Sequence, residues 1–362
     1  MRSITVLLTG AGSPGTAALV RALRENGERD VRIVGVDMSE RSVGRHLCDA
    51  FHLVAASDDP SFAASLLELV NREGIDVVLP QTSYDLPALA GARESFPVPV
   101  LVSSAETVRR SNDKAETYAL LRELGVTAPD FRRAHGGLAV EGAAMELGYP
   151  QHDVAVKPIF SSGSRGFRIL SAGADRHKQL LTNRPGVAEA LRLEELVELL
   201  GDDETELLVM ELAEGGERTI DGIADGRRVV LGHPKTREAM RAGLAMYFVT
   251  LADDALMELA ERIVAALEIE HFFNIQLVGE HVIEVNPRIS TIVYQEDLNL
   301  PYLGVKQALG EISREELAEL SARVRPTRRA LRYFDQVEWD DMSSAAETAM
   351  PPRSWTPTSS LE

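Results

Sequence analysis

A carboxylate and an amide stand two residues apart in the stretch VIEVNPRIS, at Glu284 and Asn286. If this stretch is a strand, both side chains point to the same face. Their oxygens are ligands that Mg²⁺ accepts together with phosphate oxygens of a substrate. Arg288 follows on the same side if the chain stays extended through Pro287. A lone Glu-x-Asn pair is more often a solvated edge strand, but the Pro-Arg that follows favours a metal site with a cation beside it.

Gln276, on the preceding apolar run FFNIQLVGE, is a third candidate ligand. Whether it shares the face of Glu284 depends on the turn between the two runs. A two-residue turn at 279–280 pairs Gln276 with Ile283 and places it on the opposite face. A three-residue turn at 279–281 pairs Gln276 with Glu284 directly. The sequence leaves both turns open.

Two lysines are candidate phosphate ligands. Lys114 falls in the first turn of a helix expected over 111–125, where the helix dipole disfavours a cation unless an anion is bound. A solvated lysine beside acidic neighbours is the alternative. Lys157 ends the apolar run VAV and precedes a Ser/Gly loop whose N–H groups and hydroxyls suit phosphate oxygens, unless the loop is a plain flexible hairpin. The loop positions are Ser161, Ser162, Gly163, Ser164 and Gly166.

Further polar residues follow two more expected strands. In ELLVMELAEGGERTIDG, residues 211–213 end a strand and offer backbone groups at a domain seam. Glu217, after the double glycine, is either an acceptor for ribose hydroxyls or an ordinary surface acid. In HPKTREAMRAG, Arg237 and Arg241 stand four residues apart and would share a face of a helix. A charge-balanced surface is the alternative there.

Apolar runs predict the elements that position these residues. From residue 151 to about 300, strand-like runs separated by turn residues predict an α+β region with antiparallel hairpins. A Glu-rich helix and a disordered tail are expected to follow it. The first 105 residues alternate continuous apolar runs with helical patterns, which predicts a doubly wound α/β domain with a parallel sheet. Its expected strands are 4–9, 31–37, 49–55, 76–81 and 98–103.

The N-terminal domain also carries a glycine loop with the spacing G-x-G-x-x-G, formed by Gly10, Gly12 and Gly15. Asp37 ends the next apolar run, at about the interval expected for a ribose-binding acid. An NAD-dependent dehydrogenase is therefore a rival interpretation. It leaves everything after residue 110 unexplained.

Composition excludes several classes of protein. A formal net charge of −18 over 362 residues argues against nucleic acid or an anionic membrane as a partner. The single cysteine, Cys48, excludes a disulfide framework and a thiolate metal cluster. No run approaches the roughly 18 consecutive apolar residues of a membrane span. The N-terminus has no cleavable signal pattern, and we expect a cytoplasmic protein.

In their order, these motifs resemble the ATP-grasp superfamily, and in particular single-unit relatives of the carbamoyl phosphate synthetase large subunit. The resemblance spans roughly residues 1–310 and is most specific in VKPIFSSGSRG, NIQ, IEVNPRIS and YQEDLNLPYLGVKQALG. It implies the ATP-grasp fold, α/β and α+β, with a Rossmann-like pre-ATP-grasp domain over 1–110. Linker helices and a small clamp subdomain are implied over 111–210, a C-terminal subdomain with the metal site over 211–312, and a helical extension with a disordered tail over 313–362.

The resemblance also implies ATP with Mg²⁺ or Mn²⁺ as cofactors. Gln276, Glu284 and Asn286 match the metal ligands, and Arg288 matches the arginine that stabilises charge on the transferring phosphoryl group and the acyl phosphate. The glycine loop then binds no dinucleotide, faces the ATP site and can help to hold the carboxylate substrate. The residues implied to hold ATP are Lys114, Lys157, Ser161, Ser162, Gly163, Ser164, Gly166, Glu211, Leu212, Ala213 and Glu217.

The sequence shows one grasp unit and neither a glutaminase nor a regulatory domain, which argues against carbamoyl phosphate synthesis by this chain alone. We expect a ligase that activates a carboxylate as an acyl phosphate and joins it to an amine, as in amino-acid or peptide ligation. Arg237 and Arg241 are candidate carboxylate anchors, and Tyr84 and Asp85 are candidates for orienting the other substrate.

The expected partners are the carboxylate and the amine, both small molecules. The sequence also allows a homodimer. The rivals in the same chemistry are a carboxylate kinase and a carbamate kinase. A nucleotide-binding regulator without turnover is a further rival. It would be favoured by loss of a metal ligand or of the arginine, and both are present.

Overall fold

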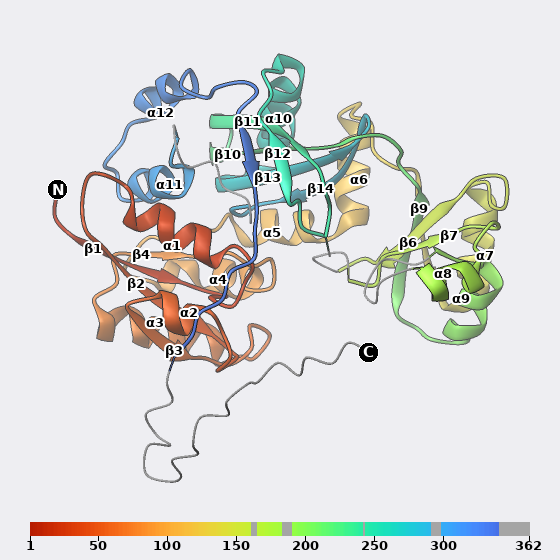
Figure 1. Ribbon diagram of the computed structural model, residues 1–362, viewed down its shortest axis with the longest axis horizontal. Helices are drawn as coiled ribbons and strands as arrows, with labels where there is room; N and C mark the ends of the chain where they lie inside the picture. The colour runs from red at the N-terminus through yellow and green to blue at the C-terminus, as the bar shows by residue number, and fades with distance from the viewer. Residues whose placement is uncertain (161–164, 183–189, 242, 291–297, 340–362) are drawn as a thin grey trace, which may run out of the picture.

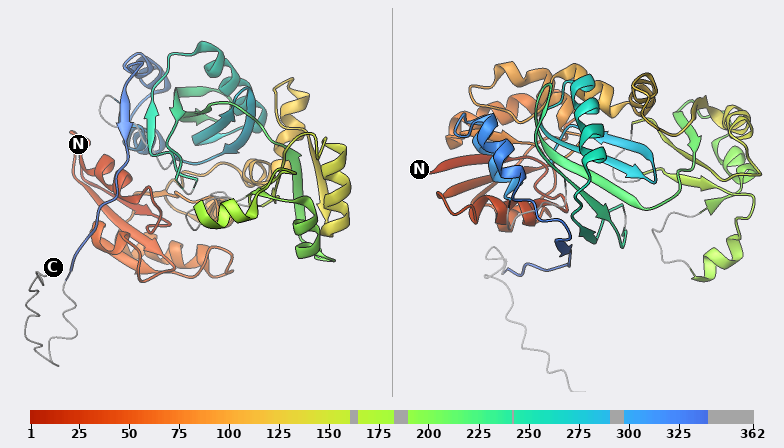
Figure 2. Two further views of the ribbon diagram at one scale, coloured as in Figure 1. Left: turned by 45° about the vertical axis from the view of Figure 1, so that its right-hand side comes forward. Right: turned by 90° about the horizontal axis from the view of Figure 1, so that it is seen from above.

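The computed structural model of the chain describes residues 1–160, 165–182, 190–241, 243–290 and 298–339. It has the mixed α/β and α+β architecture that the sequence predicts. Figure 1 shows the N-terminal sheet with its helices, the C-terminal sheet beside them, and a smaller domain in yellow and green set apart at one end. Figure 2 shows the same separation from two further directions. Within the described residues, no helix has both the length and the apolar character needed to cross a membrane.

The N-terminal domain is a parallel sheet with the strand order β3-β2-β1-β4. Leu7 packs against α3 and α4 on one face, whereas Val6 and Leu8 pack against α1 and α11 on the other, so the sheet is doubly wound. The run at 98–103, predicted as a fifth strand, makes a single isolated bridge to β4. The elements are β1 (Ile4–Leu8), α1 (Thr16–Arg24), β2 (Val31–Asp37), α2 (Gly44–Leu47), β3 (Ala50–Leu53), α3 (Phe62–Glu73), β4 (Val77–Leu79), α4 (Leu86–Ala92) and a 3₁₀ turn (Arg93–Ser95).

Two helices link this domain to the rest of the chain, where the sequence predicts one helix over 111–125. They are α5 (Ala105–Asn112) and α6 (Lys114–Glu123). Asp113 separates them, and its side chain caps α6 by accepting from the backbone N–H of Glu116. Because α6 starts here, Lys114 stands at its first position, as the pattern indicates.

The small domain is built on a five-stranded sheet with the order β5-β9-β6-β7-β8. Helices α7 and α9 pack over it through apolar residues such as Val140 and Leu196. The stretch around HGGLAVEG, interpreted above as a change of region, forms α7. The elements are β5 (Phe131–His135), α7 (Gly136–Glu146), β6 (Val154–Pro158), β7 (Arg168–Leu170), α8 (Arg176–Thr182), β8 (Ala190–Leu191), α9 (Leu193–Leu200) and β9 (Glu206–Glu211).

The C-terminal sheet has the order β11-β10-β13-β14 and is antiparallel throughout, which confirms the predicted hairpins. Helix α10 covers one face, where Ile263 and Val264 pack with Ile220 and Ile275. The other face carries polar side chains and borders the pocket described below. The elements are β10 (Glu217–Asp225), β11 (Val229–Arg237), β12 (Tyr247–Val249), α10 (Asp254–Leu267), β13 (Glu270–Val278) and β14 (His281–Asn286).

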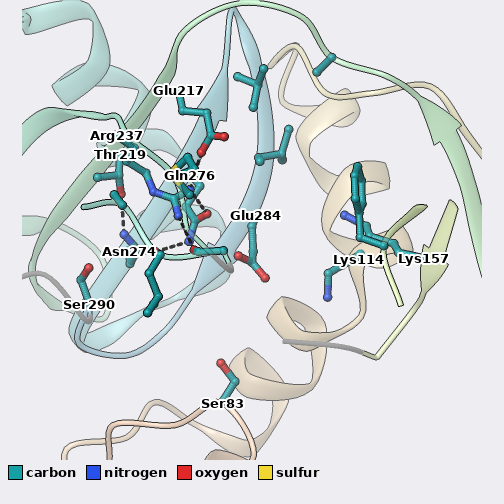
Figure 3. Close-up of a pocket in the computed structure, with 18 of the residues that line it drawn as sticks. Ser83, Lys114, Lys157, Glu217, Thr219, Arg237, Asn274, Gln276, Glu284 and Ser290 are labelled. Carbon is teal, nitrogen blue, oxygen red and sulfur yellow. Dashed lines mark hydrogen bonds and ion pairs between the residues drawn. The ribbon is translucent and has the colours of Figure 1, made fainter. Parts of the chain in front are cut away.

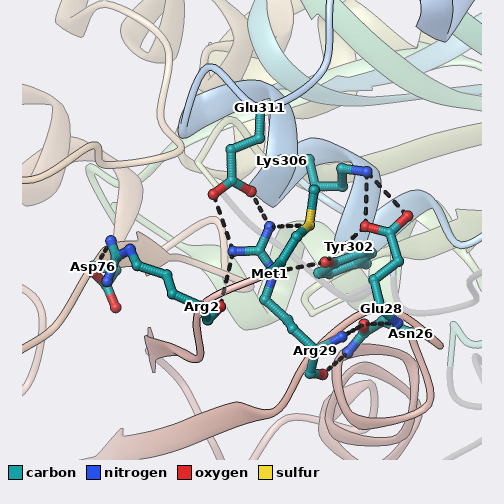
Figure 4. A network of polar contacts seen from close by, with 9 residues as sticks. All are labelled: Met1, Arg2, Asn26, Glu28, Arg29, Asp76, Tyr302, Lys306 and Glu311. Carbon is teal, nitrogen blue, oxygen red and sulfur yellow. Dashed lines mark hydrogen bonds and ion pairs between the residues drawn. The ribbon is translucent and has the colours of Figure 1, made fainter.

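The last described segment returns to the N-terminal domain. It comprises α11 (Leu300–Ala308), α12 (Arg314–Ser321) and β15 (Arg329–Leu331), which pairs with β12. Figure 4 shows how α11 and the turn after it are fastened to the first domain. The buried guanidinium of Arg29 pairs with Glu311 and donates to the hydroxyl of Tyr302 over 2.8 Å, and Lys306 pairs with Glu28. This network holds the first domain against the C-terminal half.

Candidate active site

One pocket of about 820 Å³ lies where the small domain, the C-terminal sheet and loops of the N-terminal domain meet. Residues of α6, β6 and β9 line one side of it, and residues of β10, β11 and the β13–β14 hairpin line the other. Its size suits a small-molecule cofactor together with a substrate. The predicted site residues that line it are Tyr84, Lys114, Lys157, Glu211, Leu212, Ala213, Glu217, Arg237, Gln276, Glu284 and Arg288.

Lys114 and Lys157 reach this pocket from two elements, α6 and β6 (Figure 3). Both are buried, with 7% and 8% of their surface exposed. Lys114 donates to the carbonyl of Ile159 over 3.4 Å, and Lys157 donates to the hydroxyl of Tyr118 over 3.1 Å. Burial lowers the pKa of Lys114, and burial together with the charge of Lys114 lowers the pKa of Lys157 to about 7, against the attraction of Glu284. Two buried amines facing one pocket suit a multiply charged anion.

The loop after β6 was predicted to hold phosphate. Ser161, Ser162, Gly163 and Ser164 lie outside the described residues, and Gly166 does not line the pocket. Arg165 does line it, although the sequence analysis passed it over. Its guanidinium donates to the hydroxyl of Tyr84 over 3.1 Å and lies 5.5 Å from the centre of that ring. Arg165 therefore contacts the N-terminal domain across the pocket.

The predicted metal face is formed by the β13–β14 hairpin. Its turn has two residues, 279–280, because Val278 pairs with His281. Continued without interruption, that register would place Gln276 opposite Ile283. A β-bulge at residue 283 shifts the register by one residue, and Gln276 pairs with Glu284. Gln276, Glu284 and Asn286 therefore share one face through a bulge rather than through the three-residue turn considered above.

The possible ligands on this face are one carboxylate and two amides. The described part of the chain contains no cluster of three or more His, Cys, Asp and Glu able to hold a metal ion. A cation here would therefore depend on Glu284 and amide oxygens. Asn286 is 5% exposed, and the hydroxyl of Ser83 lies 3.5 Å from its Oδ1. Carboxylate, amide oxygens and substrate phosphates together fit Mg²⁺, which needs few protein ligands.

Arg237 occupies a place that the sequence did not predict. The idea that it shares a helix face with Arg241 is wrong, because residues 229–237 form strand β11 and Arg237 pairs there with Glu217. Its guanidinium donates to Glu217 over 3.0 Å and to the amide oxygen of Gln276 over 2.6 Å. Arg241 does not line the pocket, and its guanidinium lies over the ring of Phe334. Of the two arginines predicted as carboxylate anchors, Arg237 faces the pocket and Arg241 does not.

Arg288 follows β14 and also faces the pocket. Its Nε donates to the hydroxyl of Ser83 over 2.8 Å, and its Nη1 donates to the carbonyl of Ile289 over 2.9 Å. Burial lowers the pKa of Arg288, while the charges of Glu284 and Asp221 raise it. The Ser83 contact ties this guanidinium to the loop after β4. The acids considered as alternative partners, Glu296 and Asp297, lie outside the described residues.

Residues 211–213 lie at the end of β9 and line the pocket, and their role as a hinge stays a prediction. Glu217 starts β10 and lines the same wall, but its carboxylate is paired with Arg237. A ribose hydroxyl would therefore share this carboxylate with the guanidinium. The nucleotide roles of these residues remain predictions.

The N-terminal glycine loop faces the pocket through Ser13 and Pro14. Gly10 needs its positive φ of 59°, and a side chain there would clash with Thr82. Asp37, the acid that would hold a ribose in a dehydrogenase, accepts instead from the loop's own Gly12 N–H over 2.7 Å. Asp85 does not line the pocket. It is buried and accepts from the hydroxyl of Thr9 over 2.7 Å, so the structure gives it a place inside the first domain rather than beside a substrate.

Beneath the metal face lies a polar network that the sequence analysis missed. Lys235 and Asp221 form an ion pair of 2.6 Å, and both are about 1% exposed. Asn274 links this pair to the face, because its Nδ2 donates to Asp221 over 2.8 Å and its Oδ1 accepts from Gln276 over 2.9 Å. Figure 3 shows Asn274 and Gln276 side by side on this face. Polar residues at every second position of β10 and β13 were the available indication, since they define one polar face.

Two family models match separate parts of the chain. Residues 6–101 match the family described as PylC-like, N-terminal domain, and residues 203–330 match the family described as ATP-grasp in the biosynthetic pathway with Ter operon. The second match contains the β10–β14 sheet, the metal face and Arg288. The first covers the N-terminal sheet and its glycine loop.

Solved structures share the fold at low sequence identity. The L-amino acid ligase from Bacillus licheniformis is 16% identical, with a TM-score of 0.61 over 91% of this chain and 79% of that one. A biotin carboxylase from Campylobacter jejuni, solved as a beta-gamma-ATP complex, is 16% identical, with a TM-score of 0.60 over 86% and 72%. The biotin carboxylase domain of the Hydrogenobacter thermophilus 2-oxoglutarate carboxylase, solved with MgADP and bicarbonate, is 15% identical, with a TM-score of 0.62 over 90% and 73%. The ATP-grasp family match at 203–330, the shared fold and the arrangement of the pocket agree, and the chain has the ATP-grasp fold.

Proposed function

We propose that the protein is an ATP- and Mg²⁺-dependent ligase that activates a carboxylate as an acyl phosphate and joins it to an amine. One observation carries the proposal. Two buried lysines, Lys114 and Lys157, face the same pocket as the carboxylate of Glu284 and the guanidinium of Arg288. This is the arrangement of charges that a nucleoside triphosphate with its metal ion requires.

The residues fit the absent groups. Glu284 and Asn286 are the metal ligands we propose, with Gln276 beside them, and Lys114 and Lys157 would hold the phosphates from the opposite wall. Bound Mg²⁺ supplies charge neutralisation at the phosphate oxygens. The hinge at 211–213 would border the nucleotide base.

Arg288 is the residue to which we assign stabilisation of the reaction. A guanidinium can donate to two oxygens at once, which suits the charge that spreads over a phosphoryl group and an acyl oxygen. Its Nε is held by Ser83 and its Nη1 by the carbonyl of Ile289, so the group is oriented before a substrate arrives. Preorganised donors of this kind need little rearrangement during the reaction.

Arg237 is the anchor we propose for the carboxylate substrate. It faces the pocket, and its own contacts hold it on the wall next to the metal face. An acidic protein that binds an anion needs such a local cation, because its overall field repels the substrate. The L-amino acid ligase from B. licheniformis shares the fold, which supports an amino acid as the carboxylate.

A screen of carboxylates and amines in pairs tests the proposal. Amino acids, alone and in pairs, are incubated with ATP and Mg²⁺, and release of ADP and phosphate is measured together with the ligated product. We expect ADP release that requires both partners of one class of pair. ADP release with a carboxylate alone, accompanied by a stable acyl phosphate, would show a kinase instead. Stabilisation of the fold by NADH and not by ATP would contradict the proposal.

A further inference from the structure

The hydroxyl of Tyr118 stands between the two walls of the pocket. Tyr118 lies one turn after Lys114 on helix α6 and is 1% exposed, with its ring 5.7 Å from that of Phe131. Its hydroxyl donates to the backbone carbonyl of Ile283 over 2.8 Å and accepts from the amine of Lys157 over 3.1 Å. One hydroxyl group therefore contacts both the strand of the predicted metal ligands and a predicted phosphate lysine.

Ile283 is the extra residue of the β-bulge. A bulged residue stands outside the regular ladder, and the bulge bends its strand. Without it, the register that starts at the turn would set Glu284 opposite Ile275 instead of Gln276. Glu284 and Asn286 would then leave the polar face and point into the apolar layer under α10. The position of the two predicted metal ligands on β14, Glu284 and Asn286, depends on this single residue.

The tyrosine hydroxyl has one proton to donate and can accept at the same time. Burial raises the pKa of Tyr118, so the hydroxyl keeps its proton and serves as the donor to Ile283. Lys157 then finds an acceptor on the same oxygen. Because Lys157 belongs to β6 of the small domain and Ile283 to the C-terminal sheet, the hydroxyl joins the two parts of the chain that enclose the pocket.

We propose that Tyr118 is a positioning residue that holds the bulge at Ile283 and fixes the distance between Lys157 and the metal face. The assignment rests on the proposed function, because the distance between Lys157 and the metal face matters only if a nucleotide and its metal ion bind there. Any buried tyrosine hydroxyl needs a hydrogen-bond partner. The informative feature is that the Tyr118 hydroxyl contacts one group on each side of the pocket, Lys157 and the carbonyl of Ile283. Here the hydroxyl donates to the backbone carbonyl of Ile283, the bulged residue that sets the register of Glu284 and Asn286.

The test compares Tyr118→Phe with Tyr149→Phe. Both changes remove one hydroxyl from a buried tyrosine, and the hydroxyl of Tyr149 accepts from the backbone N–H of Leu193 in the small domain. The first measurement is amide hydrogen exchange of the β13–β14 hairpin in protein without nucleotide. We expect faster exchange in this hairpin for Tyr118→Phe and no change there for Tyr149→Phe.

The second measurement is the affinity for a non-hydrolysable ATP analogue with Mg²⁺, by calorimetry. Loss of a hydrogen bond to a charged group is expected to weaken binding roughly tenfold in Tyr118→Phe, with the control unchanged. In a Lys157→Met background, the same tyrosine substitution should cost distinctly less. Wild-type exchange and wild-type affinity in Tyr118→Phe would overturn the assignment. A wild-type protein that binds no nucleotide would overturn the proposed function, while hairpin exchange would still decide whether Tyr118 holds the bulge.

Discussion

Arg237 donates a hydrogen bond of 2.6 Å to the amide oxygen of Gln276. The predicted carboxylate anchor thus contacts the atom that was predicted to bind a metal ion. The other end of the Gln276 amide donates to Asn274 over 2.9 Å, so both of its polar ends are engaged. Gln276 is neutral, so it does not offset the positive charge of Arg237. Glu217 already neutralises part of that charge. We infer that Gln276 orients Arg237 as well as bordering the metal face.

Gln276→Glu separates these two roles. An acid here would pair with Arg237 and reduce its attraction for an anionic substrate. We expect the KM for the carboxylate to rise about tenfold, as for the loss of one charge-assisted contact, with little change in the Mg²⁺ requirement. Steady-state kinetics at varied carboxylate and varied Mg²⁺ check this, with the uncharged Gln276→Met as the control. A lower Mg²⁺ requirement with an unchanged carboxylate KM would show instead that residue 276 is a metal ligand and that Arg237 is not the anchor.

Glu284→Ala should abolish ATP turnover and leave the fold intact. The side chain is half-buried at the pocket wall, so its loss removes a ligand rather than core packing. Glu280→Ala is the matched control, because Glu280 sits in the exposed turn of the same hairpin. ADP release and the melting temperature are measured for both variants. Near-wild-type ADP release from Glu284→Ala would show that Glu284 is only a carboxylate on the strand, with no part in ATP turnover.

The low pKa of Lys157, about 7, predicts proton uptake when ATP binds. At pH 8 this amine is mostly neutral in the free protein, and phosphate oxygens beside it would raise its pKa and protonate it. At pH 6 it is already charged, so uptake through this group should vanish. Calorimetry in buffers of different ionisation enthalpy measures the number of protons. We expect close to one proton at pH 8 and far less at pH 6.

Lys157→Arg provides the control for that measurement, because arginine stays charged at both pH values. Its proton uptake at pH 8 should be much smaller than that of the wild type. If the wild type bound ATP at pH 8 without taking up a proton, Lys157 would not meet the phosphates.

Arg288→Lys should bind ATP nearly as well as the wild type and turn over far more slowly. The expected loss is about 2–4 kcal/mol of activation free energy, by comparison with removal of one oxyanion donor. A lysine cannot reproduce the fork of the guanidinium or its contact with Ser83. Turnover and melting temperature are measured together. A lower melting temperature with an unchanged rate would assign Arg288 to the fold alone.

Local patterns predicted the N-terminal sheet and the shared face of Glu284 and Asn286, because both follow from alternation along single strands. They did not predict the bulge at Ile283. Its carbonyl meets the hydroxyl of Tyr118, a partner 165 residues away in the sequence. The helix proposed for Arg237 and Arg241 failed for a similar reason. Pairing with β10 overrides the four-residue spacing, and a sequence pattern does not show which strand lies alongside.

The buried ion pair of Lys235 and Asp221 could not be predicted from the sequence either. In the sequence, Lys235 stands two residues before Arg237, with nothing to mark it as buried, whereas in the fold it is buried beside Asp221. Only the register between β10 and β11 brings the two together. The prediction that Asp85 orients a substrate failed for the same reason. Its partner Thr9 follows β1, which lies beside β4 in the parallel sheet, and the sequence does not show that neighbour.

Transfer of a heavy-oxygen label from the carboxylate to phosphate tests the central claim most directly. Once the pair screen has identified the carboxylate, it is supplied with both oxygens labelled, together with ATP, Mg²⁺ and the amine. If the protein forms an acyl phosphate that the amine then attacks, one labelled oxygen leaves with each phosphate, and mass spectrometry of the phosphate will show one label per product formed. Unlabelled phosphate released in step with ligated product would contradict the account, because the carboxylate would then have been activated by a route other than phosphorylation.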